Sequence, residues 1–292
     1  MIRLNDVING RYKILSELGH GGTSDVYEVR DPIFKRIDAL KILKFDCAQK
    51  IENIVRFQNE ARFLAAFNHP NIIAVYDYGE YENLPYIVTE FVNSQTLRDV
   101  LDYKRIFSLK ESCQIMLQLC DAVSVIHSKN IIHRDIKPHN IYYSTDGVIK
   151  LADFGISTVY GEKPVINENK KIIGTVQYLA PEIIYGKKPD FRSDIYSLGI
   201  TFFELLTGRV PFDSERPEEV ASMQIKQKMI SPLKFNPSLP KEVELIIFKA
   251  TDKEPKNRYS SVAHLKKDIE NLYNKNGNKR GKGLKNFFGL SE

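Results

Sequence analysis

The segment His133-Arg134-Asp135-Ile136-Lys137-Pro138-His139-Asn140 (HRDIKPHN) and the tripeptide Asp153-Phe154-Gly155, thirteen residues after Asn140, decide how this chain is interpreted. Together they contribute carboxylate, amide and ammonium groups. Phosphoryl transfer from a nucleotide uses such a set, because it needs oxygen ligands for Mg²⁺, a carboxylate at the attacking hydroxyl and a cation at the transferred group. Each residue alone has a structural explanation, such as an Asx turn for Asn140, but the combination has none. We expect Asp135 to accept the hydroxyl proton, Lys137 to reach the γ-phosphate, and Asn140 and Asp153 to bind metal.

A glycine-rich segment, Gly19-His20-Gly21-Gly22, lies between two β-like runs, residues 12–17 and 25–30. Glycines of this kind let backbone N–H groups approach a polyphosphate closely. The segment is not a Rossmann fingerprint, because a strand follows it, and it is not a Walker loop, because no G-K-[ST] sequence closes it. By itself it is a weak signal, since such hairpins are more often plain turns.

Lys41 ends an apolar strand predicted over residues 37–43, and Glu60 lies near the buried face of a helix predicted over residues 49–67. The helix is indicated by apolar residues at spacings of three and four and by a proline that ends it. A buried carboxylate needs a cationic partner. We therefore expect Glu60 to hold Lys41 so that its ammonium group can neutralise phosphate oxygens.

The remaining pattern predicts an α+β fold with two lobes. Two more strands, at residues 72–78 and 86–92, complete a small lobe of five strands and one helix over residues 1–92. The larger lobe, residues 93–273, is helical, and we expect a basic flexible tail over residues 274–292. Apolar residues from Cys113 to Ile126 mark the buried face of one predicted helix. A second helix is predicted over residues 193–207; it is apolar nearly all round and is capped by Gly208. Two amphipathic helices are predicted at residues 243–250 and 262–272.

Composition excludes several classes of protein. The 292 residues are 42% hydrophobic and 27% charged, which is typical of a globular chain and not of a disordered one. No apolar run approaches the roughly 18 residues of a membrane span and the N-terminus resembles no signal peptide, so we expect a cytoplasmic protein. Because the cytoplasm keeps thiols reduced, we expect the three cysteines to be free thiols. Residues 274–292 hold five Lys or Arg and one Glu, which is +4 of the net charge of +5, so nucleic-acid binding is only a minor alternative.

These motifs, in this order, resemble those of the eukaryotic-like bacterial serine/threonine protein kinases, and they are most similar to those of kinases that carry extracellular PASTA repeats. The resemblance covers about residues 8–273. Further motifs that carry it are Ala39-Leu40-Lys41, Gly174-Thr175-Val176-Gln177-Tyr178, Ala180-Pro181-Glu182, Ser193-Asp194-Ile195-Tyr196-Ser197-Leu198-Gly199 and Arg258.

The resemblance implies a bilobal kinase fold and transfer of the γ-phosphate of ATP, with Mg²⁺ or Mn²⁺, to Ser or Thr hydroxyls of proteins, with autophosphorylation. It implies that Lys41 binds the α- and β-phosphates, that Glu60 orients Lys41, that Asp135 is the catalytic base with Lys137 beside it, and that Asn140 and Asp153 hold magnesium. The nucleotide site would comprise Gly19, His20, Gly21, Gly22, Val26, Ala39, Lys41, Thr89 as gatekeeper, Glu90 to Val92 as the adenine hinge, and Tyr142. Glu182 should pair with Arg258, and Asp194 should anchor the catalytic loop.

Three residues depart from the family pattern. Ser24 replaces the third glycine of the loop, a change between small residues that should be tolerated. Tyr142 stands where Leu or Met is usual beneath the adenine. His139 stands where many arginine-directed kinases have Glu, which argues against specificity for basic residues.

Two other functions stay open: a small-molecule phosphotransferase and a catalytically weak regulatory module. The expected partners are protein substrates and a second copy of the chain for autophosphorylation, without nucleic acid. The tail is expected to be a solvated, disordered segment. The other interpretation is that the tail, or a C-terminal region missing from a truncated receptor kinase, brings the chain to the cytoplasmic face of a membrane.

The segment from Gly161 to Gly174 contains no Ser, Thr or Tyr. In similar kinases a phosphorylated residue there neutralises the arginine before the catalytic Asp. We therefore expect Glu168, or else Glu162, to give Arg134 a fixed negative partner and to make basal activity largely independent of phosphorylation. The alternative is that Glu168 points to solvent.

Overall fold

The structure is a computed structural model that describes residues 2–153, 158–159 and 175–277. The chain divides into two compact units. The first unit comprises residues 1–94 and 152–156, and the second comprises residues 95–151 and 157–292.

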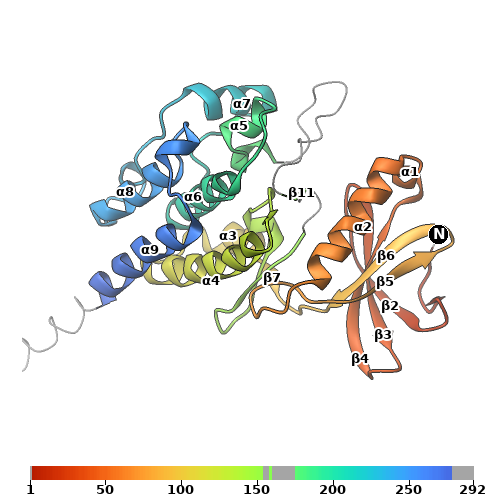
Figure 1. Ribbon diagram of the computed structural model, residues 1–292. Helices are drawn as coiled ribbons and strands as arrows, with labels where there is room; N and C mark the ends of the chain where they lie inside the picture. Colours follow the sequence, from red (N-terminus) through yellow and green to blue (C-terminus); the bar gives the residue numbers. More distant parts are fainter. Residues whose placement is uncertain (1, 154–157, 160–174, 278–292) are drawn as a thin grey trace, which may run out of the picture. The chain divides into compact units, whose positions relative to one another are not determined.

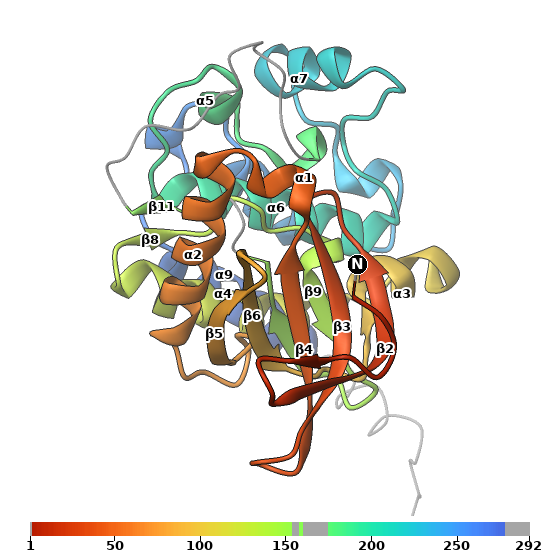
Figure 2. The same ribbon diagram turned by 90° about the vertical axis from the view of Figure 1, so that its right-hand side faces the viewer.

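The first unit is an antiparallel six-stranded sheet with two helices (Figures 1 and 2). The strands, in sheet order, are β1 (Val7–Ile8), β2 (Tyr12–His20), β3 (Ser24–Asp31), β4 (Arg36–Leu43), β6 (Leu84–Glu90) and β5 (Val75–Tyr81). The helices are α1 (Phe45–Ala48) and α2 (Ile51–Ala65). The prediction of five strands and one helix was therefore wrong, because it missed β1 and α1. Both elements are too short to show the hydrophobic periodicity of a strand or a helix.

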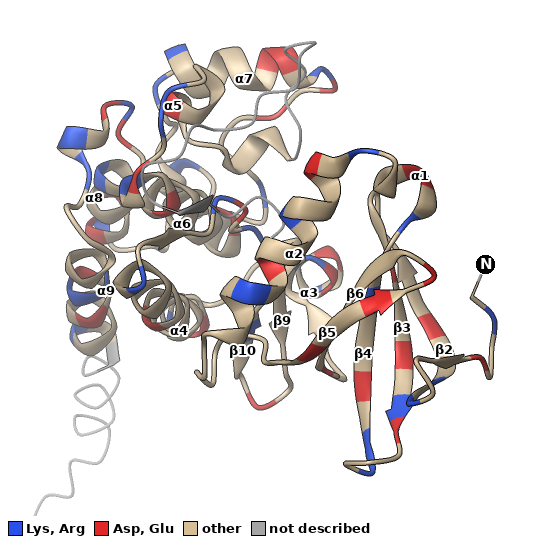
Figure 3. Cartoon of the chain, turned by 45° about the vertical axis from the view of Figure 1, so that its right-hand side comes forward, with Lys and Arg blue, Asp and Glu red and all other residues tan. Residues whose placement is uncertain are grey.

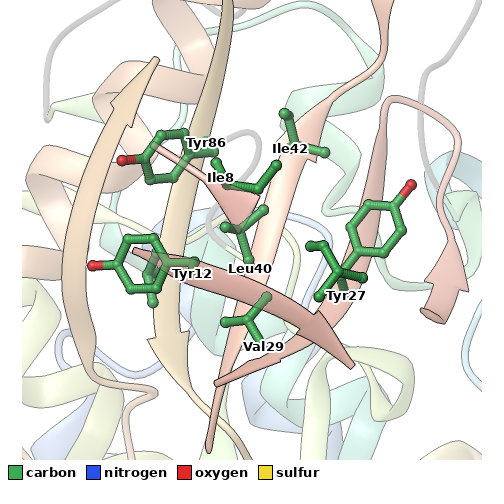
Figure 4. Packing of buried hydrophobic residues seen from close by; sticks show 9 residues of the cluster. Ile8, Tyr12, Tyr27, Val29, Leu40, Ile42 and Tyr86 are labelled. Atoms are coloured by element: carbon green, nitrogen blue, oxygen red, sulfur yellow. The ribbon is translucent and has the colours of Figure 1, made fainter. Parts of the chain in front are cut away.

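The two faces of this sheet bury different residues. Figure 4 shows Tyr12, Leu40 and Tyr86 among the side chains packed on one face. On the other face, Ile87 packs with Phe57 and other residues of α2. Lys41 is the register partner of Ile87 and therefore shares its face. Period-2 alternation along β4 thus directs Lys41 toward α2 and Leu40 into the opposite core.

The second unit is mainly helical. Its helices are α3 (Leu97–Lys104), α4 (Leu109–Ser128), α5 (Pro181–Ile184), α6 (Phe191–Thr207), α7 (Pro217–Lys226), α8 (Lys241–Ala250) and α9 (Val262–Gly277). Short strands form a three-stranded sheet of β10 (Ile149–Leu151), β9 (Ile141–Tyr143) and β7 (Gln95–Thr96), and a pair of β11 (Thr158–Val159) and β8 (Ile131–Ile132). Four 3₁₀ turns are η1 (Pro138–Asn140), η2 (Val176–Tyr178), η3 (Pro232–Lys234) and η4 (Pro255–Asn257).

Helix α6 is the centre of this unit. Every residue from Ser193 to Thr207 is buried, as its all-round apolar pattern predicts, and Gly208 ends it in the left-handed conformation. A Cβ at Gly199 would lie 2.6 Å from Thr251 Cγ2 and 2.9 Å from Ala250 Cβ. Glycine at this position therefore sets how closely α6 packs against α8.

Helix α9 continues to Gly277, four residues past the predicted end of the larger lobe at residue 273. It carries both acidic and basic residues (Figure 3), and Lys266 pairs with Asp121 of α4 at 2.7 Å. None of the helices in the described part of the chain combines the length and the apolar character that a membrane crossing requires.

Candidate active site

The glycine-rich segment forms the hairpin between β2 and β3. The N–H of Gly21 donates to the Ser24 carbonyl at 2.8 Å, and a Cβ at Gly21 would meet that oxygen at 3.0 Å. Gly19 and Gly22, in contrast, face open space. A side chain at Gly21 would therefore crowd the turn, which leaves room for a ligand's phosphates beside the other two glycines.

Lys44 holds the tip of this hairpin, and sequence reasoning missed it. Its Nζ donates to the Gly21 carbonyl at 2.6 Å and lies 3.4 Å from Asp25 Oδ1. Asp25 also contacts the imidazole of His20, with 2.8 Å between Nδ1 and Oδ1. A lysine that follows an apolar strand has no distinguishing pattern, so no sequence signal could have identified this contact.

Lys41 lies between two carboxylates within the first unit. Its Nζ is 2.9 Å from Glu60 Oε1 and 2.8 Å from Asp153 Oδ1. Burial alone would lower the pKa of Lys41, but the negative charges of Glu60 and Asp153 outweigh it and raise the pKa. The expected pair with Glu60 is therefore present, the ammonium group stays charged, and Asp153 is a second partner.

Other residues expected at the nucleotide lie on the same sheet face as Lys41. Strand register pairs Val26 with Lys41 and Ala39 with Thr89, and directly opposed residues in an antiparallel pair share a face. All four are only partly buried. This face is thus lined by small and apolar side chains with one cation, which suits a flat aromatic ring joined to phosphates.

The expected hinge begins where β6 ends. Glu90 is bound to Ala74 twice: its backbone N–H donates to the Ala74 carbonyl at 2.9 Å, and its Oε1 accepts the Ala74 N–H at 2.9 Å. Ser94 N–H donates to the Val92 carbonyl at 2.9 Å. The chain from Glu90 to Val92 is therefore fixed to Ala74 at its start and followed by a local backbone bond at its end.

In the second unit, Asp135 is the centre of a small polar group. Asn140 Nδ2 donates to Asp135 Oδ2 at 2.8 Å and to the Asp135 carbonyl at 2.9 Å, and Lys137 Nζ is 2.9 Å from Oδ2. Turn η1 brings Asn140 back toward Asp135 because Pro138 begins it. Both contacts engage the same carboxylate oxygen and leave Oδ1 as the acceptor for another proton.

Asp194 anchors the segment that precedes Asp135, as expected. Its carboxylate, fully buried at the start of α6, accepts the N–H of His133 at 2.9 Å and of Arg134 at 2.8 Å, and lies 2.7 Å from His127 Nε2. Burial alone would raise the pKa of Asp194, but the His127 contact and these N–H groups outweigh it and lower the pKa. The anchored backbone is strained, because Arg134 has φ of 70°.

Glu182 and Arg258 form the expected buried ion pair in bidentate geometry, with Nη1 to Oε1 at 2.8 Å and Nη2 to Oε2 at 2.7 Å. Ser193 Oγ donates to Glu182 Oε1 at 2.7 Å. Burial would raise the pKa of Glu182, yet the Arg258 guanidinium and the Ser193 hydroxyl lower it. The pair joins the start of α5 to the end of η4.

Sequence reasoning missed a further buried carboxylate, Glu204 of α6. It accepts from Tyr178 Oη at 2.5 Å and from Arg98 Nη1 at 2.6 Å. Burial raises the pKa of Glu204 despite these contacts. A polar residue inside an otherwise apolar helix was the available signal, because such a residue requires buried partners.

The expected site residues fall into two groups, each within its own unit. Lys41, Glu60 and Asp153 meet in the first unit, together with the glycine hairpin. Asp135, Lys137 and Asn140 meet in the second. Tyr142 also belongs to the second unit, on β9, where its register partners are Lys150 and Thr96. Glu162 and Glu168, which were predicted as partners of Arg134, lie outside the described residues. The same holds for Phe154 and Gly155.

The chain is similar to known proteins over most of its length. The family model described as "Protein kinase domain" matches residues 12–269. The chain is 42% identical over 266 residues to "Serine/threonine-protein kinase PrkC" of Bacillus subtilis, which covers 91% of this chain and 41% of that protein. It is 37% identical over 270 residues to "Probable serine/threonine-protein kinase PknB" of Lactococcus lactis, with 92% and 43% covered. With "Serine/threonine-protein kinase PknB" of Mycobacterium tuberculosis the identity is 38% over 272 residues, with 91% and 44% covered. The chain therefore spans less than half the length of these curated relatives.

Proposed function

Since this chain belongs to the protein kinase family, we propose that it transfers the γ-phosphate of ATP to serine and threonine hydroxyls of proteins, including its own. The observation that carries the proposal is that both charged groups are complete. Lys41 contacts two carboxylates at 2.9 and 2.8 Å, and Asp135 is bound by an amide and an ammonium group at 2.8 and 2.9 Å. A chain that had lost catalysis would be expected to lack one of these residues.

The family implies the use of ATP and a divalent cation, and when bound they supply the transferred group and neutralise its charge. We propose Mg²⁺, with Mn²⁺ as a substitute. The carboxylate of Asp153, whose side chain is 51% exposed, and the amide oxygen of Asn140 offer the hard oxygen ligands that Mg²⁺ prefers. Because Asn140 Nδ2 donates to Asp135, its Oδ1 is the atom that would be available to hold a cation.

Two further assignments describe what the chain's own residues do. Lys41, kept charged by its carboxylates, orients the α- and β-phosphates beside the hairpin glycines. Asp135, held through Oδ2, uses Oδ1 to accept the proton of the substrate hydroxyl. Lys137, whose Nζ lies 2.9 Å from Asp135 Oδ2, would reach the γ-phosphate and neutralise its charge. Lys137 and Thr175 together support Ser and Thr as substrates, because tyrosine-directed relatives usually place other residues there.

Phosphate transfer to defined acceptors tests the proposal. With Mg²⁺ and radiolabelled ATP, the full chain should label casein on Ser and Thr but should not label an aminoglycoside. Asp135→Asn should abolish the labelling. Labelling of the aminoglycoside alone would instead identify a small-molecule phosphotransferase, and no labelling of either by wild type would leave a regulatory module.

We also propose that autophosphorylation occurs between two copies and that the chain works in the cytoplasm near a membrane. Mixing wild type with Asp135→Asn tests the first point, since the inactive copy should become labelled at a rate that rises with wild-type concentration. Co-sedimentation with anionic vesicles, weakened by salt, tests whether the basic residues 278–292 supply the membrane proximity.

A further inference from the structure

Turn η2 has three consecutive carbonyls that accept hydrogen bonds from side chains of other elements. Gln224 Nε2, on α7, donates to the Gln177 carbonyl at 2.5 Å and, over 3.4 Å, to that of Val176. Ser197 Oγ, on α6, donates to the Tyr178 carbonyl at 2.8 Å. A short 3₁₀ turn normally leaves such groups to water, so this one is fixed by two helices.

Apolar packing fixes the same turn from both sides. Val176 packs with Val220 and Ala221 of α7, whereas Tyr178 packs with Tyr196 of α6. Thr175 and Gln177 remain partly exposed. The arrangement buries alternate side chains and presents the intervening two at the surface.

Both the nitrogen and the oxygen of the Gln224 amide form hydrogen bonds, although the side chain is completely buried. Its nitrogen serves two carbonyls, and its oxygen accepts from the Tyr196 hydroxyl. A buried amide of this kind adds little net stability, but removing it leaves several polar groups without partners. The glutamine is therefore more significant for the position of the turn than for the apolar core of α7.

We propose that Gln224 is a positioning residue for protein-substrate binding: it holds turn η2 so that Thr175 and Gln177 meet the substrate chain. The inference rests on the proposed function, in which Thr175 supports Ser and Thr hydroxyls of proteins as substrates. Gln224 itself belongs to neither charged group and has no role at the nucleotide.

The test compares Gln224→Met with wild type in the full chain. Methionine preserves length and volume and removes both donor and acceptor. We expect the KM for a Ser/Thr peptide to rise about five- to tenfold, with kcat, the KM for ATP and peptide-independent ATP hydrolysis each changed less than about twofold. Tyr196→Phe, which leaves the Gln224 donors in place, should raise the peptide KM by less.

Gln118→Met is the matched control. Gln118 is also a helical glutamine that fixes a turn, because its Nε2 donates to the Gly147 carbonyl at 2.9 Å and its Oε1 accepts the Ile149 N–H at 3.1 Å. If Gln224 only stabilises the fold, both variants should lower the melting temperature and all kinetic constants alike. That result, or an unchanged peptide KM in Gln224→Met, would overturn the proposal.

Hydrogen exchange separates this inference from the proposed function. The N–H groups of Tyr178 and Leu179 donate within the turn at 3.3 and 3.1 Å, and they should exchange faster in Gln224→Met but not in Gln118→Met. Wild type that labels no Ser or Thr would refute the kinase assignment, and the exchange rates would still decide whether Gln224 holds the turn. Unchanged exchange in an active kinase would refute Gln224 alone.

Discussion

At Lys41, burial and charge act in opposite directions on one ammonium group. Its side chain is only 21% exposed, which disfavours the charge, but Glu60 and Asp153 both lie within 2.9 Å of Nζ. The raised pKa shows that the carboxylates dominate. Lys41 is therefore a permanent cation near neutral pH, suited to bind phosphate and unsuited to exchange protons.

Lys41→Ala should lower turnover by roughly 10²-fold, or about 2.7 kcal/mol of transition-state stabilisation, because it removes the charge proposed to orient the phosphates and removes little of the core. Steady-state kinetics on the peptide reaction measure this loss. Lys266→Ala, which breaks an ion pair with Asp121 on the second unit, is the control and should retain activity. Activity of Lys41→Ala within a factor of a few of wild type would show that the assignment is wrong.

Asp135 and Asp153 should separate chemistry from binding. Asp135→Asn removes the proposed proton acceptor and should abolish transfer while leaving Mg-ATP affinity nearly unchanged. Asp153→Asn removes a proposed cation ligand and one partner of Lys41, and should weaken nucleotide binding. Titration with a fluorescent ATP analogue distinguishes the two, and equal loss of affinity in both would contradict the division of roles.

At the scale of elements, α6 is where packing and chemistry meet. It carries Asp194, Ser197 and Glu204, whose side chains bind the catalytic segment, turn η2 and Arg98 respectively. Its Gly199 lies against Ala250 of α8 and the following Thr251. A shift of this one helix would therefore move several parts of the second unit together.

Gly199→Ala should destabilise the protein by about 1–3 kcal/mol, because the new Cβ would overlap Thr251 and Ala250 in a packed core. Alanine's better helix propensity, at most about 1 kcal/mol, should not offset this overlap. Urea unfolding measures the difference. Gly22→Ala, where a Cβ meets nothing within 4 Å, is the control and should unfold like wild type. Equal midpoints for both variants would show that α6 and α8 can move apart at little cost.

For the molecule as a whole, buried carboxylates set the response to acid. The pKa values of Glu182 and Asp194 are lowered in the folded state, so between the folded and unfolded pKa values the unfolded chain binds more protons. Their stabilisation is present above the ordinary carboxylate pKa and is lost as the pH falls through the folded values. Glu204, with its raised pKa, acts in the opposite sense and loses stability as the pH rises.

Asp194→Asn should therefore be less stable than wild type at pH 7 and should lose less of its free energy of unfolding between pH 6 and pH 3. Urea unfolding across this range provides the measurement, with the exposed Asp213→Asn as control. A variant whose free energy of unfolding falls as steeply with acid as that of wild type would show that Asp194 contributes nothing to the acid response.

The sequence could determine features that depend on local periodicity and pairings that the chemistry of a buried group requires. Alternation and spacing indicated most strands and helices of the first unit and the central helix α6. The pairing of Lys41 with Glu60 could be inferred across 19 residues because a buried carboxylate requires a cation. The kinase motifs indicated the family, since they preserve the order of the chemical groups and not only their composition.

What only the tertiary structure decided was the choice of partners between distant segments. Asp153 reaches Lys41 across 112 residues, Arg98 reaches Glu204 across 106, and Gln224 reaches Val176 across 48. Each of these polar groups had to find a partner once it was buried, but many residues of the right chemistry were available in the chain. The packing of distant segments decided which of these residues became the partner, and the periodicity of the sequence contains no information about that choice. For the same reason β1 and α1 escaped prediction, because elements of two and four residues are stabilised by their neighbours and not by their own sequence.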